Sequence, residues 1–469
     1  MNHPEENLGR NATRLAMLVV LLCVPVLQYA QCQGGEDQPV QMTPPRDAFA
    51  EVGQRVSSFG GMFVDEAADT LYVYLVAGGA GDATAVDKAI SDIFRADRPP
   101  LHHFQVLAGK YTYLQLREWQ QLVTQHVLTT PGVAGVGVNQ THNRLSVDVE
   151  SANDVWRIRG DVAALGMPAD AFSVVPTADW NPNPVDTNSS VSTDEPADTC
   201  TVKTLQDRCR PLVGGLRIAV SEENDSKYSL CTLGFMATWK KVRGFVTNDH
   251  CLRNDERPQD SIFYQPGIAE GNRIGVGCYN PKVFSNETNK DCPAKSKKDT
   301  FDPVCRYADA TFAKLDSGIE ASMGLIAQAS RDSNKWDGAG KYKIIGQVNE
   351  PMEGQFVRMV GQVSGTISGK IDSLHKNLKK HNSNEYELDQ ITLDRLDRTP
   401  VNGDSGSPVF VVGKTDESGI INVTLVGIFW GTPDGSTSRG DISPITNVKM
   451  TNELGPTLQV CADGSDPKC

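Results

Sequence analysis

A serine between two glycines, directly before an apolar segment, constrains this chain more than any other feature. The stretch reads Val401-Asn402-Gly403-Asp404-Ser405-Gly406-Ser407-Pro408-Val409-Phe410. Glycine permits the positive φ and the close backbone approach that a turn presenting a nucleophile needs. The amides of Gly403 and Ser405 are then expected to point at one spot, where an oxyanion would develop. A hydroxyl is a weak nucleophile without a base, and a hairpin turn rich in Gly, Asp and Ser is the plain alternative.

The base that such a serine requires is found upstream, in a short apolar run that ends at His250 and Cys251. Cys231 opens another segment of β character, and the two segments suggest a hairpin joined by a Cys231–Cys251 disulfide that fixes His250. Two other histidines of this half, His375 and His381, lie in a Lys-rich stretch from Leu374 to Asn384 that indicates a solvated loop. We therefore assign the base to His250.

The serine and histidine motifs together resemble the chymotrypsin-type (trypsin-like) serine peptidases. Cys231–Phe235 and the His-Cys ending are most similar to the secreted bacterial branch, the streptogrisins and alpha-lytic protease, and the resemblance covers roughly Val213 to Val448. It implies the chain order His, Asp, Ser, which predicts an acid between His250 and Ser405.

Asp309 is the first candidate for that acid, because it leads the alternating segment Arg306–Leu315, as the family's acid does. Asp302 and Asp316 are the competitors. Asp302 precedes a proline and Asp316 follows the predicted strand instead of entering it, so we rank both below Asp309.

The resemblance also implies the fold and the mechanism. It specifies an all-β fold of two antiparallel six-stranded barrels with the triad in the cleft between them. Ser405 would attack a peptide carbonyl, His250 would take the proton and return it, and Asp309 would hold the imidazole tautomer. The amides of Gly403 and Ser405 would form the oxyanion hole. The predicted function is a secreted serine endopeptidase made as a precursor, and it needs no metal and no organic cofactor.

Four residues are expected to contact the substrate: Thr399, Asn402, Trp430 and Gly431. Trp430 and Gly431 belong to a segment that resembles the strand along which a substrate backbone pairs. Thr399 lies six residues before Ser405, at the position of the pocket floor, and the absence of an Asp there argues against a preference for Lys or Arg.

The carboxylate of Asp404 is expected to turn inward and to be paired, because an unpaired buried charge is costly. The Arg that the bacterial branch uses for this purpose is missing before Ser364-Gly365. Arg358 is the preferred partner, and a new amine at Leu212 is the alternative. Two further departures from the family pattern are Asp249, which adds a carboxylate beside the base, and Ser407, where Gly is commonest.

Composition shifts along the chain predict a multidomain precursor. The apolar stretch Arg14–Ala30 is too short to span a membrane comfortably and indicates a signal peptide. The predicted boundaries are a signal peptide at 1–32, a linker at 33–56, an α+β region at 57–178, a Pro/Ser/Asn-rich linker at 179–212, the peptidase at 213–459 and a tail at 460–469.

The α+β region is predicted from periodicity. Strands are expected at Thr70–Val76, Val133–Val138 and Leu145–Val149, and helices at Ala85–Arg95, Leu114–Val127 and Val155–Leu165. In place and order this region resembles the pro-domains of the same bacterial peptidases, which implies that it acts as the enzyme's own inhibitor or folding aid. An unrelated binding module fused upstream is the alternative.

The remainder has short apolar runs punctuated by Gly, Asn and Asp, which is typical of an all-β barrel or sandwich. The runs are Phe356–Val360, Gly365–Ile371, Tyr386–Leu393, Val409–Val412 and Ile421–Trp430.

The charge and the cysteines exclude several classes of function. A formal net charge of −13 argues against nucleic acid and anionic membrane surfaces as partners. Eleven cysteines without a Cys-x-x-Cys pair favour disulfides in an extracellular setting over a metal site. Removing Cys23 and Cys32 with the signal peptide leaves nine, with Cys200–Cys209 and Cys461–Cys469 as expected local pairs. One thiol among Cys278, Cys292 and Cys305 would then be free.

Two other functions remain open at this point. One is a catalytically inactive peptidase homologue that acts as a binding protein, and the other is an esterase with the same chemistry. Esterases usually carry a different serine motif.

Overall fold

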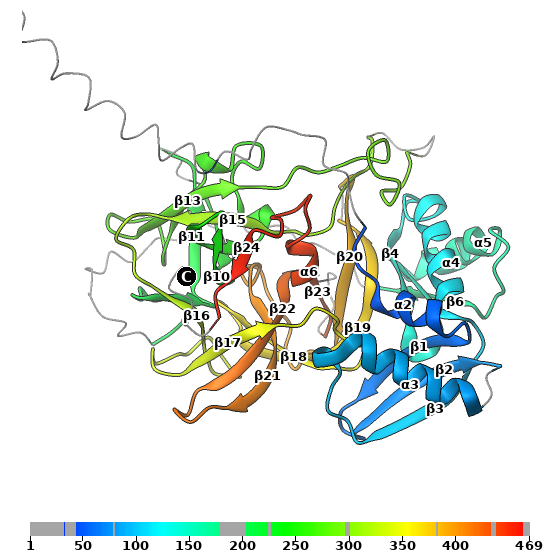
Figure 1. Ribbon diagram of the computed structural model, residues 1–469. Coiled ribbons are helices and arrows are strands. Elements are labelled where there is room, and N and C mark those ends of the chain that lie inside the picture. The colour runs from blue at the N-terminus through cyan, green and yellow to red at the C-terminus, as the bar shows by residue number, and fades with distance from the viewer. Residues whose placement is uncertain are drawn as a thin grey trace, which may run out of the picture. The chain divides into compact units, whose positions relative to one another are not determined.

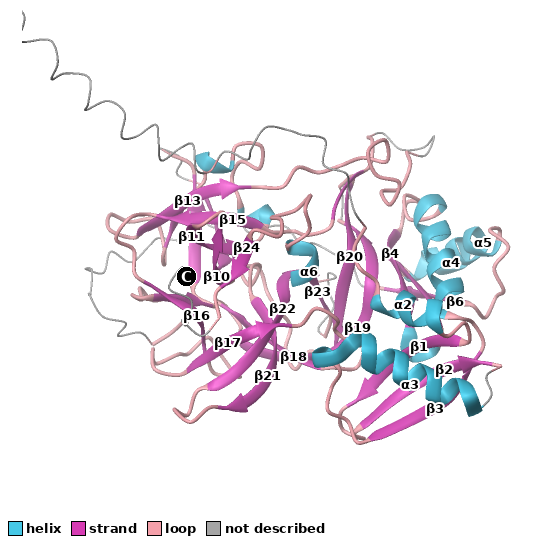
Figure 2. Cartoon of the chain, viewed as in Figure 1, coloured by secondary structure: helices cyan, strands magenta, loops and turns pink. Residues whose placement is uncertain are grey.

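The computed structural model describes residue 32 and the ranges 44–77, 80–177, 203–223, 227–295, 301–380, 383–432 and 438–462 (Figure 1). Residues 1–31 of the expected signal peptide and the 179–199 part of the expected linker lie outside these residues, as do Cys200, Cys469 and His381. No helix within the described ranges is long and apolar enough to cross a membrane. The described chain is mostly β-sheet, and its longer helices belong to the N-terminal part (Figure 2).

The N-terminal region, residues 44–177, contains four helices and six strands. The helices are α2 (Ala48–Arg55), α3 (Ala80–Phe94), α4 (Tyr113–His126) and α5 (Val155–Ala163). The strands are β1 (Phe59–Asp65), β2 (Thr70–Val76), β3 (His103–Gly109), β4 (Val133–Asn139), β5 (Arg144–Val149) and β6 (Phe172–Pro176). The strands and helices expected from the periodicity of this region are therefore present, with ends that differ by a few residues.

Local sequence explains these elements. Leu71, Val73 and Leu75 alternate into the core along β2, which pairs antiparallel with β1 and parallel with β3. Thr112 caps α4 by accepting a hydrogen bond from the amide of Gln115 at 3.2 Å.

The C-terminal region, residues 203–462, begins with an eight-stranded sheet in the order β24-β10-β11-β15-β13-β12-β8-β9. Every neighbouring pair in it is antiparallel. Its strands are β8 (Arg217–Ser221), β9 (Tyr228–Thr232), β10 (Phe235–Trp239), β11 (Val242–Thr247), β12 (Ile262–Tyr264), β13 (Arg273–Tyr279), β15 (Thr311–Leu315) and β24 (Leu458–Val460).

The second sheet of this region has the order β14-β20-β23-β22-β21-β18-β19 and carries the short helix α6 (Ile445–Val448). Its strands are β14 (Val304–Arg306), β18 (Phe356–Gly361), β19 (Gly365–Lys379), β20 (Glu385–Asp394), β21 (Pro408–Thr415), β22 (Ile421–Gly431) and β23 (Gly440–Pro444). Three more strands pair beside it: β7 (Leu212–Gly214), β16 (Ala321–Ala327) and β17 (Lys341–Gln347).

The second sheet continues into the N-terminal region, because β4 pairs antiparallel with β19 and is followed by β5 and β6. In this pairing Val136 faces Asn377 and Gly135 faces Leu378. A hydrophobic cluster also combines side chains of both regions, with Phe49 and Val136 on one side and Val357 and Leu374 on the other. The N-terminal region is thus docked on the β19–β20 hairpin through backbone pairing and through a shared core.

The Lys-rich stretch from Leu374 to Asn384 corrects one expectation. It is not a solvated loop, because residues through Lys379 form the second half of β19. The side chains of Lys376 and Lys380 are only 1% and 8% exposed, since each finds a carboxylate supplied from far away in the sequence. His375 is also buried, with its Nδ1 2.7 Å from Asp389.

The disulfides correct the expected cysteine count. Cys231 pairs with Cys251, and Cys292 pairs with Cys305. Cys32, Cys209, Cys278 and Cys461 are disulfide-bonded as well. Cys278 is therefore not a free thiol, and Cys32 of the full-length chain is paired as well.

Candidate active site

His250 lies in a single 3-10 turn, Asp249–Cys251, that follows β11. The Cys231–Cys251 disulfide ties this turn to β9. The hydroxyl of Thr247 adds a second tie, because it donates to the carbonyl of Thr232 at 3.0 Å. The imidazole is 12% exposed, so the ring is held at the edge of the sheet and is still within reach of solvent.

Asp309 lies between β14 and β15 and is fully buried. Its Oδ2 is 2.7 Å from Nδ1 of His250, and its Oδ1 accepts a hydrogen bond from the His250 amide at 3.2 Å. Burial opposes ionisation of this carboxyl, but the His250 ring and the Lys380 ammonium hold its pKa well below the usual range. Asp309 therefore has the geometry and the charge needed to fix the ring tautomer of His250. The competitors do not, because Asp316 pairs with Arg273 and Asp302 with Lys295.

Ser405 occupies the turn between β20 and β21. Gly403 and Gly406 in this turn have φ of +100° and +93°, a region that glycine adopts without strain. A Cβ on Gly406 would lie 2.2 Å from the carbonyl oxygen of Thr232, so no larger residue fits.

Thr232 connects the serine turn to the first sheet. Its amide donates to the carbonyl of Ser405 at 2.7 Å, and its hydroxyl donates to the carbonyl of Gly403 at 2.9 Å. The same residue accepts from Thr247 and follows the disulfide-bonded Cys231. One residue of β9 therefore holds both the His250 turn and the Ser405 turn. Thr232 was not among the predicted site residues, although it directly follows Cys231, which was predicted to form the disulfide.

Three groups that catalysis would use are unengaged within the described part of the chain. Nε2 of His250 is buried and has no hydrogen-bond partner. The amides of Gly403 and Ser405 donate to no other described group. Ser405 Oγ does not hydrogen-bond to Nε2 of His250, which has no partner among the described residues. The structure therefore joins His250 to Asp309 directly, and it joins the His250 turn to the Ser405 turn through Thr232.

The Asp404 carboxylate corrects another expectation. It is fully buried, and it accepts hydrogen bonds from the amides of Val363 (2.9 Å), Ser364 (3.1 Å) and Val401 (3.0 Å). Burial raises its pKa, against these hydrogen bonds and one from the Ser364 side chain. The expected ion pair with Arg358 is wrong, because backbone amides satisfy the carboxylate.

The alternative partner, a new amine at Leu212, would exist only after cleavage and stays a prediction for the cleaved protein. In the uncleaved chain the amide of Leu212 belongs to β7 and donates to the carbonyl of Glu320 at 2.9 Å. Gly361 is what makes room for the Asp404 carboxylate, since a Cβ there would meet Oδ1 at 2.3 Å.

The four expected substrate-contacting residues have different environments. Asn402 is exposed and Thr399 is partly buried. Gly431 ends β22 and faces Asp441 of β23. Trp430 is fully buried, packs with Leu378 of β19 and donates from Nε1 to Gln390 at 3.0 Å. Trp430 is thus covered by side chains of β19 and β20.

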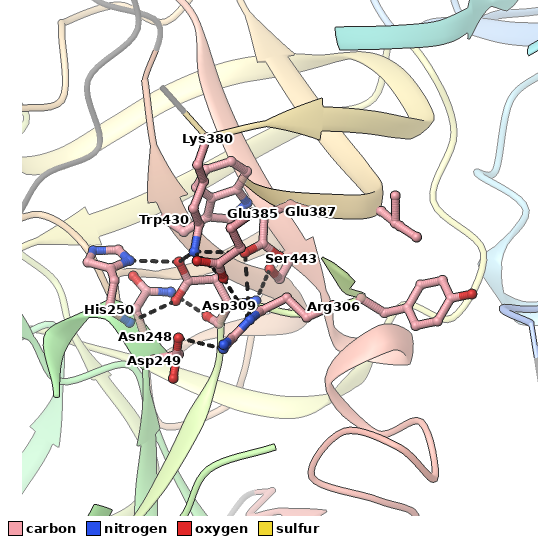
Figure 3. A network of polar contacts seen from close by, with 12 residues as sticks. Asn248, Asp249, His250, Arg306, Asp309, Lys380, Glu385, Glu387, Trp430 and Ser443 are labelled. Carbon is pink, nitrogen blue, oxygen red and sulfur yellow. Dashed lines mark hydrogen bonds and ion pairs between the residues drawn. The ribbon is translucent and has the colours of Figure 1, made fainter. Parts of the chain in front are cut away.

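A buried network of titratable groups surrounds Asp309 (Figure 3). Arg306 pairs with Asp249 at 2.5 Å and with Glu385 at 2.9 Å. Lys380 lies 3.2 Å from Asp309 and 2.9 Å from both Glu385 and Glu387. Asp249, noted in the sequence as an extra carboxylate beside the base, is therefore turned to Arg306. The sequence analysis missed Lys380 because a run of lysines resembles a solvated segment.

The end of the N-terminal region lies close to the strand next to β22. Thr177 lines a small cavity together with Asp148, Lys376, Arg439 and Asp441. Asp148 pairs with Lys376 at 2.5 Å and with Arg439 at 3.6 Å. The N-terminal region thus supplies a charge to the same end of the second sheet that carries the expected substrate strand.

Cys231, His250 and Cys251 bring ligand-type atoms within 4.8 Å of one another. Metal ligation needs thiolates, and these two sulfurs are bonded to each other. This group therefore offers no metal site.

No protein-family model matches the chain, and no curated protein matches it. Solved structures of bacterial serine proteases are similar to part of it. They include a Nocardiopsis protease (17% identity, TM-score 0.35), Thermobifida fusca protease A (16%, 0.31) and Cellulomonas bogoriensis chymotrypsin (16%, 0.31). Each likeness covers 53% of this chain and 98% of the other. Identities and TM-scores this low do not assign the chain to a family, so any function has to be argued from the geometry of the site.

Proposed function

We propose that the chain is the precursor of a secreted serine endopeptidase of the chymotrypsin type, with the two sheets of the C-terminal region as its two barrels. Ser405 attacks the peptide carbonyl, and His250 takes the proton and returns it to the leaving amine. Asp309 fixes the imidazole and stabilises the imidazolium. The amides of Gly403 and Ser405 stabilise the oxyanion. Proteins or peptides are the substrates, and the chemistry needs no metal or organic cofactor.

The observation that carries this proposal is the pairing of His250 with a buried, ionised Asp309 on a frame that also holds the Ser405 turn. The 2.7 Å contact at Nδ1 leaves Nε2 for the nucleophile, and Nε2 has no other described partner. The Thr232 hydrogen bonds fix the Ser405 turn relative to the same disulfide-bonded strand. A general base oriented by a third group beside a nucleophile turn is the arrangement that acyl transfer requires.

The N-terminal region acts in this proposal as the enzyme's own inhibitor or folding aid. Its β4 adds a strand to the β19–β20 hairpin, and Gly135 permits the close approach, since a Cβ there would meet Leu378 at 2.6 Å. Asp148 and Thr177 of this region line a cavity with Asp441 of β23, the strand beside β22, which supports an enzyme that is blocked while this region is docked. Since backbone amides already satisfy Asp404, release of the region should open the site without building it.

The test is casein turnover by the secreted protein after cleavage at a protease site engineered into residues 179–199. We expect activity in the cleaved protein, little in the uncleaved protein and none in cleaved Ser405→Ala. A cleaved, folded protein without turnover would favour the alternative of an inactive homologue that binds proteins. Turnover that required a terminus at Leu212 would contradict the amide-satisfied Asp404.

A further inference from the structure

The ammonium of Lys380 shares an oxygen with the base of the candidate triad. Its Nζ lies 3.2 Å from Oδ2 of Asp309, the atom that is 2.7 Å from Nδ1 of His250. Figure 3 shows the Lys380 and His250 nitrogens approaching the Asp309 carboxylate from different directions. Serine peptidase chemistry as proposed above needs only the histidine contact, so the lysine calls for a separate explanation.

The surroundings of Asp309 are strongly acidic. Glu385 and Glu387 reach it from β20, Asp249 from the His250 turn, and Glu453 lies beside Arg306. Three further carboxyl groups, those of Glu385, Glu387 and Asp249, therefore crowd one buried carboxylate, and two cations, Lys380 and Arg306, oppose them. The other polar neighbours, Ser443 and Asn248, are uncharged and contact only the backbone of Asp309.

A buried carboxylate among other carboxylates tends to take up a proton unless a cation is close. A protonated Asp309 would lose the charge that stabilises an imidazolium. Arg306 is committed to Asp249 and Glu385, whereas Lys380 is the cation that contacts Asp309.

We propose that Lys380 is a positioning residue for catalysis: its ammonium keeps the Asp309 carboxylate ionised and oriented toward Nδ1 of His250. This inference rests on the proposed peptidase function. It assigns a chemical role to the end of the β19–β20 hairpin, which otherwise would serve only as the surface on which β4 docks.

The backbone holds Lys380 where this role requires it. Lys379 pairs with Tyr386 across the hairpin, and the Lys380 amide donates to the carbonyl of Glu385 at 3.0 Å. Its ammonium is then fixed by Glu385 and Glu387, each at 2.9 Å.

The test is the pH profile of kcat/KM for linker-cleaved Lys380→Met, with Lys379→Met as the matched control. Removing a positive charge makes protonation of every neighbouring group easier, so the acid limb should move to higher pH by about one unit, the low end of the usual effect of a charge at this range. Lys379 contacts no carboxylate in the described part of the chain, and its variant should keep the wild-type limb. If the role of Lys380 were purely structural, Lys380→Met would reduce the folded fraction. It would then lower kcat/KM at every pH without moving the midpoint of the acid limb.

Glu385→Gln provides an independent and milder variant, because Glu385 is 21% exposed and leaves the lysine in place. Removing one negative charge should move the acid limb to lower pH, opposite to Lys380→Met. Shifts of the acid limb in opposite directions for the two variants support the inference. If Lys380→Met does not fold, the shift measured for Glu385→Gln is the test. An unchanged limb in the active Glu385→Gln and Lys380→Met enzymes, or shifts of the same sign, would overturn it. Failure of the proposed function looks different, because the wild-type protein itself would then show no Ser405-dependent turnover.

Discussion

The buried side chain of Glu353 is expected to make the docking of the N-terminal region depend on pH. This side chain belongs to the loop before β18 and is fully buried beneath the N-terminal region. Its Oε2 accepts hydrogen bonds from the amide (3.0 Å) and the hydroxyl (3.3 Å) of Thr141, while Oε1 is buried without a partner. Burial, and then the nearby Asp372, raise the pKa of Glu353 well above 4.5, against the hydrogen bonds from Gln140 and Thr141.

The direction of this pKa shift sets whether docking becomes stronger or weaker as pH rises. A raised pKa in the docked state means that docking takes up a proton, so docking is strongest below the ordinary pKa and weakens as pH rises. One proton corresponds to a tenfold change in the dissociation constant, or about 1.4 kcal/mol, per pH unit. This slope should hold from about pH 4.5 up to the raised value.

Other groups at this interface act in the same direction near neutral pH. Burial raises the pKa of Glu350 to about 7, against its ion pair with Arg46. Although burial opposes the charged form of His375, Asp47 and Asp389 raise its pKa. Both contributions are therefore also lost as pH rises.

Two interface carboxylates act in the opposite direction, but only in acid. Although burial favours their neutral forms, cationic partners hold the pKa of Asp47 and of Asp148 below 3.8. Their contributions are lost only as pH falls through those lowered values. The net prediction is docking that is tightest in mild acid and weakens toward neutral pH.

The measurement is the dissociation constant of the linker-cleaved complex by sedimentation, from about pH 5 to about pH 8. Glu353→Gln imitates the protonated side chain, so it should bind more tightly at neutral pH and lose about one decade per pH unit from the slope. Glu417→Gln, which changes an exposed carboxylate, is the control and should match the wild type. A Glu353→Gln complex with the wild-type slope, or a wild-type complex that tightens with rising pH, would show that Glu353 does not take up a proton on docking.

Substitutions of Asp309 and Thr232 test how the site holds His250 and the Ser405 turn in place. Asp309→Asn should lower turnover on the order of 10⁴-fold by favouring the wrong imidazole tautomer, whereas Asp302→Asn and Asp316→Asn should be nearly silent in the same casein assay; a reversed ranking would move the acid. Thr232→Val leaves the buried Gln362 amide without its acceptor and removes one of two donors to the Gly403 carbonyl, which keeps Gln362 Nε2 at 3.3 Å. This change should cost about 1–3 kcal/mol in the free energy of unfolding and lower turnover. Thr238→Val, on the neighbouring strand, should do neither, and equal effects of the two valines would remove the special role of Thr232.

The sequence was most informative where chemistry depends on short spacing. The glycines around Ser405, the His250-Cys251 corner and the Asp309 that enters a strand each carry their information within a few residues. The structure brings His250 and Asp309 into contact, and both glycines beside the Ser405 turn have the positive φ that the motif indicated.

The sequence was least informative about buried charges, because their partners are far away in the chain. Lys376 is paired with Asp148, 228 residues earlier, and nothing in a run of lysines indicates such a contact. For Asp404 the reasoning required a cation, but amides of Val363 and Ser364 satisfy the carboxylate, and backbone donors leave no trace in residue type. Short-range patterns therefore predicted the contact between His250 and Asp309, whereas they did not indicate the distant and backbone partners of the buried charges.

The assignment of Ser405 as nucleophile is tested most directly by the mass of the Ser405 peptide after the linker-cleaved protein reacts with a fluorophosphonate. We expect one phosphonate adduct on Ser405, lost in Ser405→Ala and nearly lost in His250→Ala, with casein turnover disappearing in proportion to labelling. Casein turnover without an adduct at Ser405, or equal labelling of the His250→Ala protein, would contradict the assignment of these two residues as nucleophile and base.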